Sequence, residues 1–190
     1  MIRVAVDAMG GDNAPVEMVA GAVEAVKKKP EIQVLLVGQE KTVQEELSKY
    51  TYDKEKIQVV NASEVIATEE PPVNAIRKKK DSSIVVGMNL VKNGQADAFV
   101  SAGSSGAILV GGQVIVGRIK GVERASCYRL FLQKKAYPFC RLRGECRRQG
   151  VSSGTVSRMG SIYMGTRSRN SKSKSCHCKY RCGRERETHW

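Results

Sequence analysis

Hydrophobic and polar positions follow two alternating periods along the first part of the chain. Short runs of apolar, largely β-branched residues predict buried strands at residues 2–8, 32–37, 57–60 and 97–101. Between them, apolar residues that recur every three or four positions predict helices at residues 16–29, 43–50, 77–80, 83–91 and 107–116. Strands that alternate with helices at this spacing indicate an α/β fold in three layers, with a mainly parallel, doubly wound sheet.

The pattern ends near residue 124. Only six of the 66 residues that follow are Val, Ile or Leu, and no helical or strand period is left in them. Such a segment cannot offset its chain entropy by burying apolar surface. We therefore divide the chain into residues 1–124, the N-terminal part of an α/β domain, and residues 125–190, a basic tail rich in Cys, Arg and Ser that we expect to be poorly ordered.

Charge follows the same division. The whole chain contains 32 Lys and Arg against 19 Asp and Glu, a formal net charge of +13. Residues 1–124 contain 16 residues of each sign, so the whole excess falls after residue 124. The α/β domain is therefore not basic, and any interpretation as a nucleic-acid-binding protein would depend on the tail alone.

The absence of cysteine and histidine from residues 1–124 excludes several chemistries there. A Ser-His-Asp triad, a cysteine nucleophile, a disulfide framework and a His/Cys zinc site all need those residue types. Cys176, Cys178 and Cys182, with His177, lack the paired Cys-x-x-Cys spacing of zinc sites, so we expect no metal. No apolar run approaches the ~20 residues that span a membrane, and no signal peptide opens the sequence. We expect a cytoplasmic protein.

Two glycine-containing turns each join a predicted strand to a predicted helix. The first, residues 7–15, contains Gly10 and Gly11, and the second, residues 101–107, contains Ser104 and Ser105. Right-handed crossovers place both turns at the carboxyl edge of a parallel sheet, where ligands bind in open α/β folds.

Each turn has two interpretations. One is purely structural, with Asp12 or Asn13 capping the first helix and a serine capping the second. The other is an anion cradle made of backbone N–H groups and hydroxyls at helix N-termini. Neither the dinucleotide nor the Walker fingerprint is present.

Basic residues in the first domain are also open to two interpretations. The run Arg77–Lys80 is either a solvated surface or a docking site for an acidic partner. Arg118, Lys120 and Arg124 have the same two interpretations.

Three segments resemble one family. They are VAVDAMGGDNAP, KKDSSIVVGMNLVKNGQADAFVSAGSSGA and GRIKGVER, and they are similar to the bacterial acyl-acyl carrier protein:phosphate acyltransferases of phospholipid synthesis, the PlsX type. The likeness runs from Ile2 to about Arg124. The family usually has Asn-Thr where this chain has Ser104-Ser105, so a hydroxyl is kept at the second position and an amide is lost at the first. The resemblance implies a Rossmann-like, isopropylmalate-dehydrogenase-like sheet, truncated here.

The resemblance also implies an activity and partners. The reaction is transfer of a fatty acyl group from acyl carrier protein to inorganic phosphate, which gives acyl phosphate and needs no cofactor. The enzyme is a homodimer in the family, nucleic acid is not an expected partner, and peripheral contact with a membrane is left open. We expect Asp12 and Ser105 to be catalytic, with Asp12 orienting donors rather than contacting phosphate, because two anions repel. Residues expected to bind phosphate or substrate are Asp7, Gly10, Gly11, Asn13, Gly103, Ser104, Gly106, Arg118 and Lys120.

The tail departs from the family. Of three later family motifs only residues 159–164, MGSIYM, occur as written. Codons for residues 143–150 and 176–187, read one base later, can encode strings like the other two, GANVDAK and NIGAEE. We interpret most of residues 125–190 as out-of-frame translation, and we expect the 190-residue chain to have little acyltransferase activity. The alternative is a non-catalytic α/β protein whose genuine basic tail binds RNA or anionic lipid.

Overall fold

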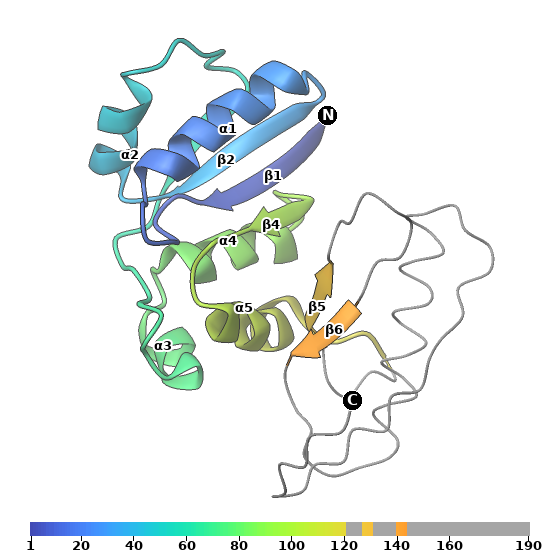
Figure 1. Ribbon diagram of the computed structural model, residues 1–190. Helices are drawn as coiled ribbons and strands as arrows, with labels where there is room; N and C mark the ends of the chain where they lie inside the picture. Colours follow the sequence, from blue (N-terminus) through green and yellow to red (C-terminus); the bar gives the residue numbers. More distant parts are fainter. Residues whose placement is uncertain (121–126, 131–139, 144–190) are drawn as a thin grey trace, which may run out of the picture. The chain divides into compact units, whose positions relative to one another are not determined.

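The computed structural model describes residues 1–120, 127–130 and 140–143, and the chain divides into two units after Arg118 (Figure 1). In the second unit the described residues include two short antiparallel strands, β5 (Cys127–Leu130) and β6 (Cys140–Arg143). The sequence pattern predicted no regular element there. The cysteine cluster after residue 175, Arg124 and the rest of the predicted tail lie outside the described residues.

The first unit is built on a parallel sheet, as predicted. Its strands are β1 (Ile2–Asp7), β2 (Ile32–Gly38), β3 (Ile57–Asn61) and β4 (Ala98–Val100), in the spatial order β3-β2-β1-β4. All three pairings are parallel, and Val4 on β1 aligns with Val34 on β2 and with Ala98 on β4. The strand order reverses between β1 and β4, which is the arrangement of a doubly wound, Rossmann-like sheet.

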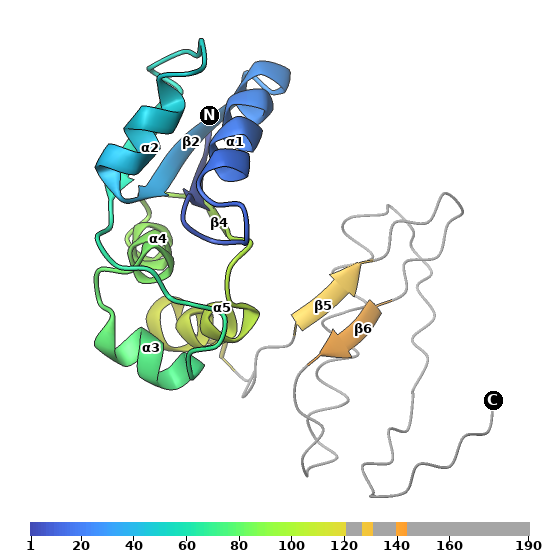
Figure 2. The same ribbon diagram turned by 60° about the vertical axis from the view of Figure 1, so that its left-hand side comes forward.

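Helices cover both faces of this sheet. Helices α1 (Val16–Lys28) and α2 (Glu40–Leu47) lie on one face, and α4 (Ser83–Lys92) lies on the other (Figures 1 and 2). Helix α3 (Pro72–Lys78) and helix α5 (Ser105–Gly111) pack beside α4, and α5 continues into a π-helical turn, η1 (Gly112–Val116). Two helical layers around one sheet confirm the three-layer α/β prediction.

The core has a separate cluster for each interface. Leu36, Val19 and Val43 belong to the cluster between the sheet and α1 and α2. Ala5, Leu35 and Val37 point to the opposite face and pack against α4. A third cluster joins α3, α4 and α5, and its buried members are Ile66, Ala75, Ile76, Ile84, Val85, Met88 and Ala107. Alternate residues of β1 and β2 thus face opposite layers, so both faces of the sheet are buried.

Helix starts agree with the sequence only in part. Ser82 caps α4 by accepting a hydrogen bond from the Val85 N–H, and Ser104 caps α5 in the same way, as expected of a serine in the second turn. Helix α1 begins after Pro15 without any side-chain cap, so the prediction that Asp12 or Asn13 caps it is wrong. The turn instead uses backbone bonds, such as that from the Glu17 N–H to the Asn13 carbonyl. The side chains of Asp12 and Asn13 are both exposed.

Among the described residues no helix combines the length and the apolar character needed to cross a bilayer.

Candidate functional site at the carboxyl edge of the sheet

The strand order defines where the two glycine-containing turns meet. From β1 the chain builds outward through β2 and β3, and it then returns to add β4 on the other side of β1. The turns after β1 and β4 therefore leave the same edge of the sheet from neighbouring strands. This confirms the expectation that Asp7 and Ser101 share the carboxyl edge. A reversal of strand order is the usual ligand-binding crevice of an open parallel sheet.

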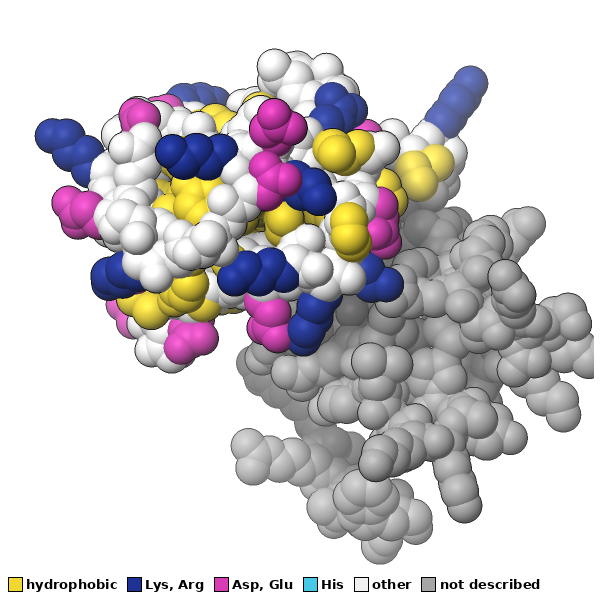
Figure 3. Space-filling model, turned by 90° about the horizontal axis from the view of Figure 1, so that it is seen from above, with side chains coloured by type: hydrophobic (Ala, Val, Ile, Leu, Met, Phe, Trp, Pro, Cys, Tyr) yellow, Lys and Arg dark blue, Asp and Glu magenta, His cyan; other side chains and the backbone are white. Residues whose placement is uncertain are grey.

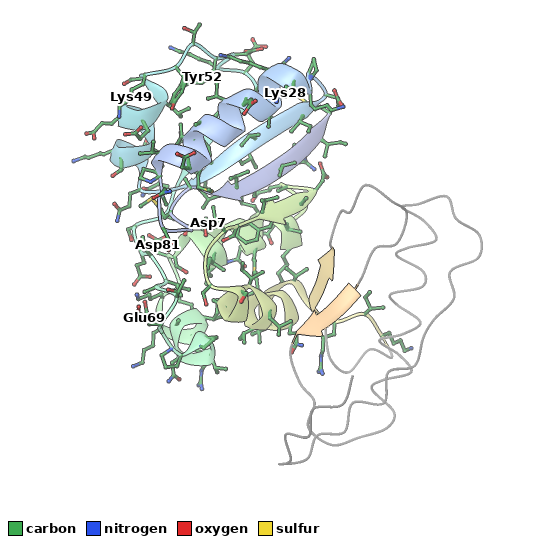
Figure 4. All side chains as sticks on the ribbon, viewed as in Figure 1. Asp7, Lys28, Lys49, Tyr52, Glu69 and Asp81 are labelled. Carbon is green, nitrogen blue, oxygen red and sulfur yellow. The ribbon has the colours of Figure 1, made fainter. Side chains whose placement is uncertain are left out.

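A chain of hydrogen bonds ties the two turns together. The Ser101 hydroxyl donates to Asp7 Oδ2 over 2.7 Å, and the Gly103 N–H donates to Ser101 Oγ over 3.0 Å. The Met9 N–H donates to the other carboxylate oxygen of Asp7 over 3.0 Å. The Asp7 side chain is only 1% exposed and lies inside the domain at the end of β1 (Figure 4). Buried carboxylates need such donors, since desolvation penalises their charge.

Glycine is required where the two turns approach each other. A Cβ at Gly10 would collide with Asp7 Oδ2 and would lie 2.8 Å from the Gly103 backbone nitrogen. A Cβ at Gly103 would lie 3.2 Å from Ser101 Oγ and 3.4 Å from the Gly10 Cα. Gly11 has φ +107°, a conformation that other residues rarely adopt. Side chains at these positions would separate the turns, so the glycines set how closely the turns pack.

The serines that begin α5 have different environments. Ser104 is 6% exposed, and its hydroxyl caps the helix by accepting from the Ala107 N–H over 3.3 Å. Ser105, the first residue of the helix, is exposed. Gly106 packs on α3, because a Cβ there would lie 2.7 Å from Pro72 Cγ. Of the two predicted hydroxyls, Ser104 is thus a capping residue, and Ser105 is the one that solvent reaches.

The other predicted site residues, Asp12, Asn13, Arg118 and Lys120, lie outside the hydrogen-bonded contact between the two turns. Asp12 and Asn13 are exposed in the first turn, between the glycines and α1. Arg118 is exposed beyond η1, and the helical segment from Ser105 to Val116 extends roughly 15–20 Å, so the helix leads away from the turns. Lys120 belongs to the second unit. The described structure therefore joins the two turns but does not bring Arg118 to them.

Two contacts are not predicted by the sequence pattern. The pattern places Ser101 at the end of a strand, and in the structure its hydroxyl links the two turns. Lys79, within the basic run, is not simply solvated: its ammonium donates to Glu70 Oε1 over 2.6 Å and to the Val65 carbonyl over 2.7 Å. The Lys79 hydrogen bond, with a further one from the Ala67 N–H, lowers the pKa of Glu70. Only knowledge of which strands are neighbours would have identified Ser101.

Comparison with known proteins adds the family. Residues 2–136 match the model of a family described as "Fatty acid synthesis protein". Proteins named phosphate acyltransferase are similar: one from Clostridium beijerinckii is 55% identical over 123 residues, 65% of this chain and 37% of that protein. One from Alkaliphilus oremlandii is 45% identical over 165 residues, 85% of this chain and 48% of that protein.

These matches show how much of a whole relative the chain spans and how far its likeness to the family continues into the tail. The chain spans between about a third and a half of the length of these relatives. The family match continues past residue 124 to residue 136, and an alignment of 165 residues also takes in part of the tail.

Proposed function

Because the chain belongs to the fatty acid synthesis protein family, we propose that it carries the N-terminal part of a phosphate acyltransferase. The reaction is transfer of a fatty acyl group from acyl carrier protein to inorganic phosphate. A phosphate oxygen attacks the thioester carbonyl carbon, a C–O bond forms, and the C–S bond breaks. The products are acyl phosphate and the free thiol of the carrier protein.

This chemistry suits a domain without cysteine or histidine. Phosphate is itself the nucleophile and a thiolate is a good leaving group, so no covalent enzyme intermediate is needed. The protein has to position phosphate beside the thioester and donate hydrogen bonds to the oxyanion that develops. The exposed Ser105 hydroxyl and the backbone N–H groups of the two glycine turns supply donors of this kind at one edge of the sheet.

The proposed roles differ between the residues of the two turns. Ser105 donates to the oxyanion, and Gly10, Gly11, Gly103 and Gly106 let the backbone approach phosphate closely. Asp12 and Asn13 orient the first turn. Asp7 and Ser104 act indirectly, since both are buried and already engaged in hydrogen bonds within the protein. Arg118 and Lys120 remain proposed sources of positive charge. We also propose that the protein assembles as a homodimer and is located in the cytoplasm.

The observation that carries this proposal is the Ser101–Asp7 hydrogen bond, which joins both turns at the reversal of strand order in a chain of this family. The test is release of free carrier-protein thiol from acyl-acyl carrier protein, with and without added phosphate. We expect phosphate-dependent release from a frame-corrected, full-length version of the protein, and little from the 190-residue chain. A frame-corrected, full-length version that releases no thiol in response to phosphate would refute the proposal.

Sequencing of the source gene is the companion test of the tail. A single uninterrupted frame without compensating insertions or deletions would reject out-of-frame translation. In that case, salt-sensitive binding of RNA or anionic vesicles that disappears on deletion of residues 125–190 would favour the alternative function.

A further inference from the structure

The outer face of α3 combines exposed positive charge with closeness to the proposed site. Ala75 and Ile76 are buried in the cluster with α4 and α5, whereas Arg77 and Lys78 are exposed. Val73, one helical turn before Arg77, is 54% exposed, and Lys80, just beyond the helix, is also exposed. We call Val73, Arg77, Lys78 and Lys80 the α3 basic face.

Lys79 sets the orientation of this face. Its ammonium is held by Glu70 Oε1 and the Val65 carbonyl, so it points toward the 65–70 segment. The carboxylate of Glu70 is thereby neutralised locally, and that of Asp81 accepts hydrogen bonds from Ser63. Glu69 is exposed beside α3 (Figure 4), and the carboxylate of Glu64 accepts a hydrogen bond from the Asp81 N–H over 3.0 Å. Residues 71–80 contain four basic residues and no acidic one, so the positive charge is concentrated on α3 itself, whereas the acidic side chains lie on the segments that flank it.

The α3 basic face also lies next to the two glycine turns. Gly106 in the first turn of α5 packs on Pro72, the first residue of α3. Arg77 follows Pro72 by five residues, which is about 8 Å along a helix. The exposed Ser105 stands at the same contact between α3 and α5. A partner seated on α3 would therefore be close to the hydroxyl that we propose to stabilise the oxyanion.

We propose that the α3 basic face is the docking surface for an acidic protein that presents the acyl thioester. This inference rests on the proposed function, which requires such a carrier. The charge on α3 complements an acidic helix, and Val73 offers a small apolar contact near the start of α3. Long-range attraction of this kind mainly raises the association rate and selects the partner. By contrast, basic and acidic side chains are interspersed on the face that carries α1 and α2 (Figure 3).

The test is a triple charge reversal with a matched control. Arg77→Glu, Lys78→Glu and Lys80→Glu are compared with Lys27→Glu, Lys28→Glu and Lys29→Glu, three exposed lysines at the end of α1. Both triples change the net charge equally, and both place acidic residues at a helix C-terminus, where the dipole disfavours them. Unacylated carrier protein is titrated into each 190-residue protein at low and at high salt.

We expect the α3 triple to weaken carrier binding on the order of tenfold or more at low salt, and the α1 triple to change it by less than about threefold. The triple Arg77→Gln, Lys78→Gln and Lys80→Gln should give a smaller loss while avoiding acidic residues at the helix end. Thermal unfolding and circular dichroism check that each variant is folded.

Several outcomes would overturn the proposal. They are equal losses in both charge-reversal triples, an unchanged Kd in the α3 triple, and no carrier binding by the unaltered chain. Binding of anionic vesicles or RNA through α3 in place of the carrier would overturn it as well. The proposed function is judged separately by phosphate-dependent thiol release, which can stand when docking at α3 is refuted.

Discussion

The Ser101 hydroxyl donates a 2.7 Å hydrogen bond to the Asp7 carboxylate across a separation of 94 residues in the sequence. The bond joins the ends of β4 and β1, which are neighbours only because the strand order reverses between them. Asp7 is buried at this contact, and the Ser101 oxygen also accepts a hydrogen bond from the Gly103 N–H. The geometry of both turns therefore depends on one serine–carboxylate pair.

The first prediction concerns that pair. Ser101→Ala should lower the free energy of unfolding by about 1.5–3 kcal/mol, the usual range for hydrogen bonds to charged groups, because a buried carboxylate loses a donor. Urea unfolding measures the loss. Ser63→Ala is the matched control, since the Ser63 hydroxyl also donates to a carboxylate, that of Asp81, in an exposed setting. The control should lose less than about 1 kcal/mol. A control loss as large as that of Ser101→Ala would contradict the role given to burial.

A second prediction compares two glycines. Gly10→Ala should destabilise the protein by roughly 1–3 kcal/mol, because the new methyl group meets Asp7 and the Gly103 backbone. Gly21→Ala should stabilise it by about 0.5–1 kcal/mol, because Gly21 lies within α1 with nothing within 4 Å of an added Cβ. Chemical unfolding of both variants gives the comparison. A neutral Gly10→Ala would show that the turns can separate without cost.

Much of the fold could be predicted because periodicity is a local property. The runs that begin at Ile2, Ile32 and Ile57 became strands, and the apolar spacing after Val16 became α1. The shared edge of Asp7 and Ser101 followed from the handedness of crossovers. These inferences need only the pattern of the sequence and the general rules for parallel sheets.

The errors arose where tertiary contacts decide the structure. A short polar side chain before a helix is a common cap, yet α1 begins after Pro15 without one, and Asp12 and Asn13 are exposed. The stretch ending at Val116 reads as one helix, but its last turn is π-helical next to Gly111, which packs against Met88. The hydrogen bond of Ser101 likewise depends on which strand lies beside β1. Spacing along the chain contains none of this information.

The third prediction is a pH dependence at Glu70. Its hydrogen bonds to Lys79 and to the Ala67 N–H lower its pKa below the ordinary 4.5. Its contribution to stability is therefore complete above pH 4.5 and is lost as the pH falls through the lowered pKa. Glu70→Gln should lower the thermal midpoint at neutral pH and have a smaller effect in acid. Glu69→Gln, at an exposed neighbouring glutamate, is the control and should change neither value. An effect of Glu70→Gln that grew in acid would contradict this account.

The last prediction separates the two serines at the start of α5. Ser104→Ala removes a helix cap and should cost about 1 kcal/mol of stability. Ser105→Ala removes an exposed hydroxyl and should change stability by less than about 0.5 kcal/mol. If Ser105 donates to the developing oxyanion, its loss should lower turnover by ~10²–10³-fold in the frame-corrected, full-length version.

The two measurements together decide the assignment. Urea unfolding of both variants gives the stability changes, and phosphate-dependent thiol release gives the rates. If Ser105→Ala lowers the rate but leaves the free energy of unfolding unchanged, local unfolding does not explain the loss of rate. Ser105→Thr keeps a hydroxyl at the same position and should recover part of the rate. Unchanged turnover in Ser105→Ala would remove Ser105 from the site. The backbone N–H groups of the glycine turns would then be the proposed oxyanion donors.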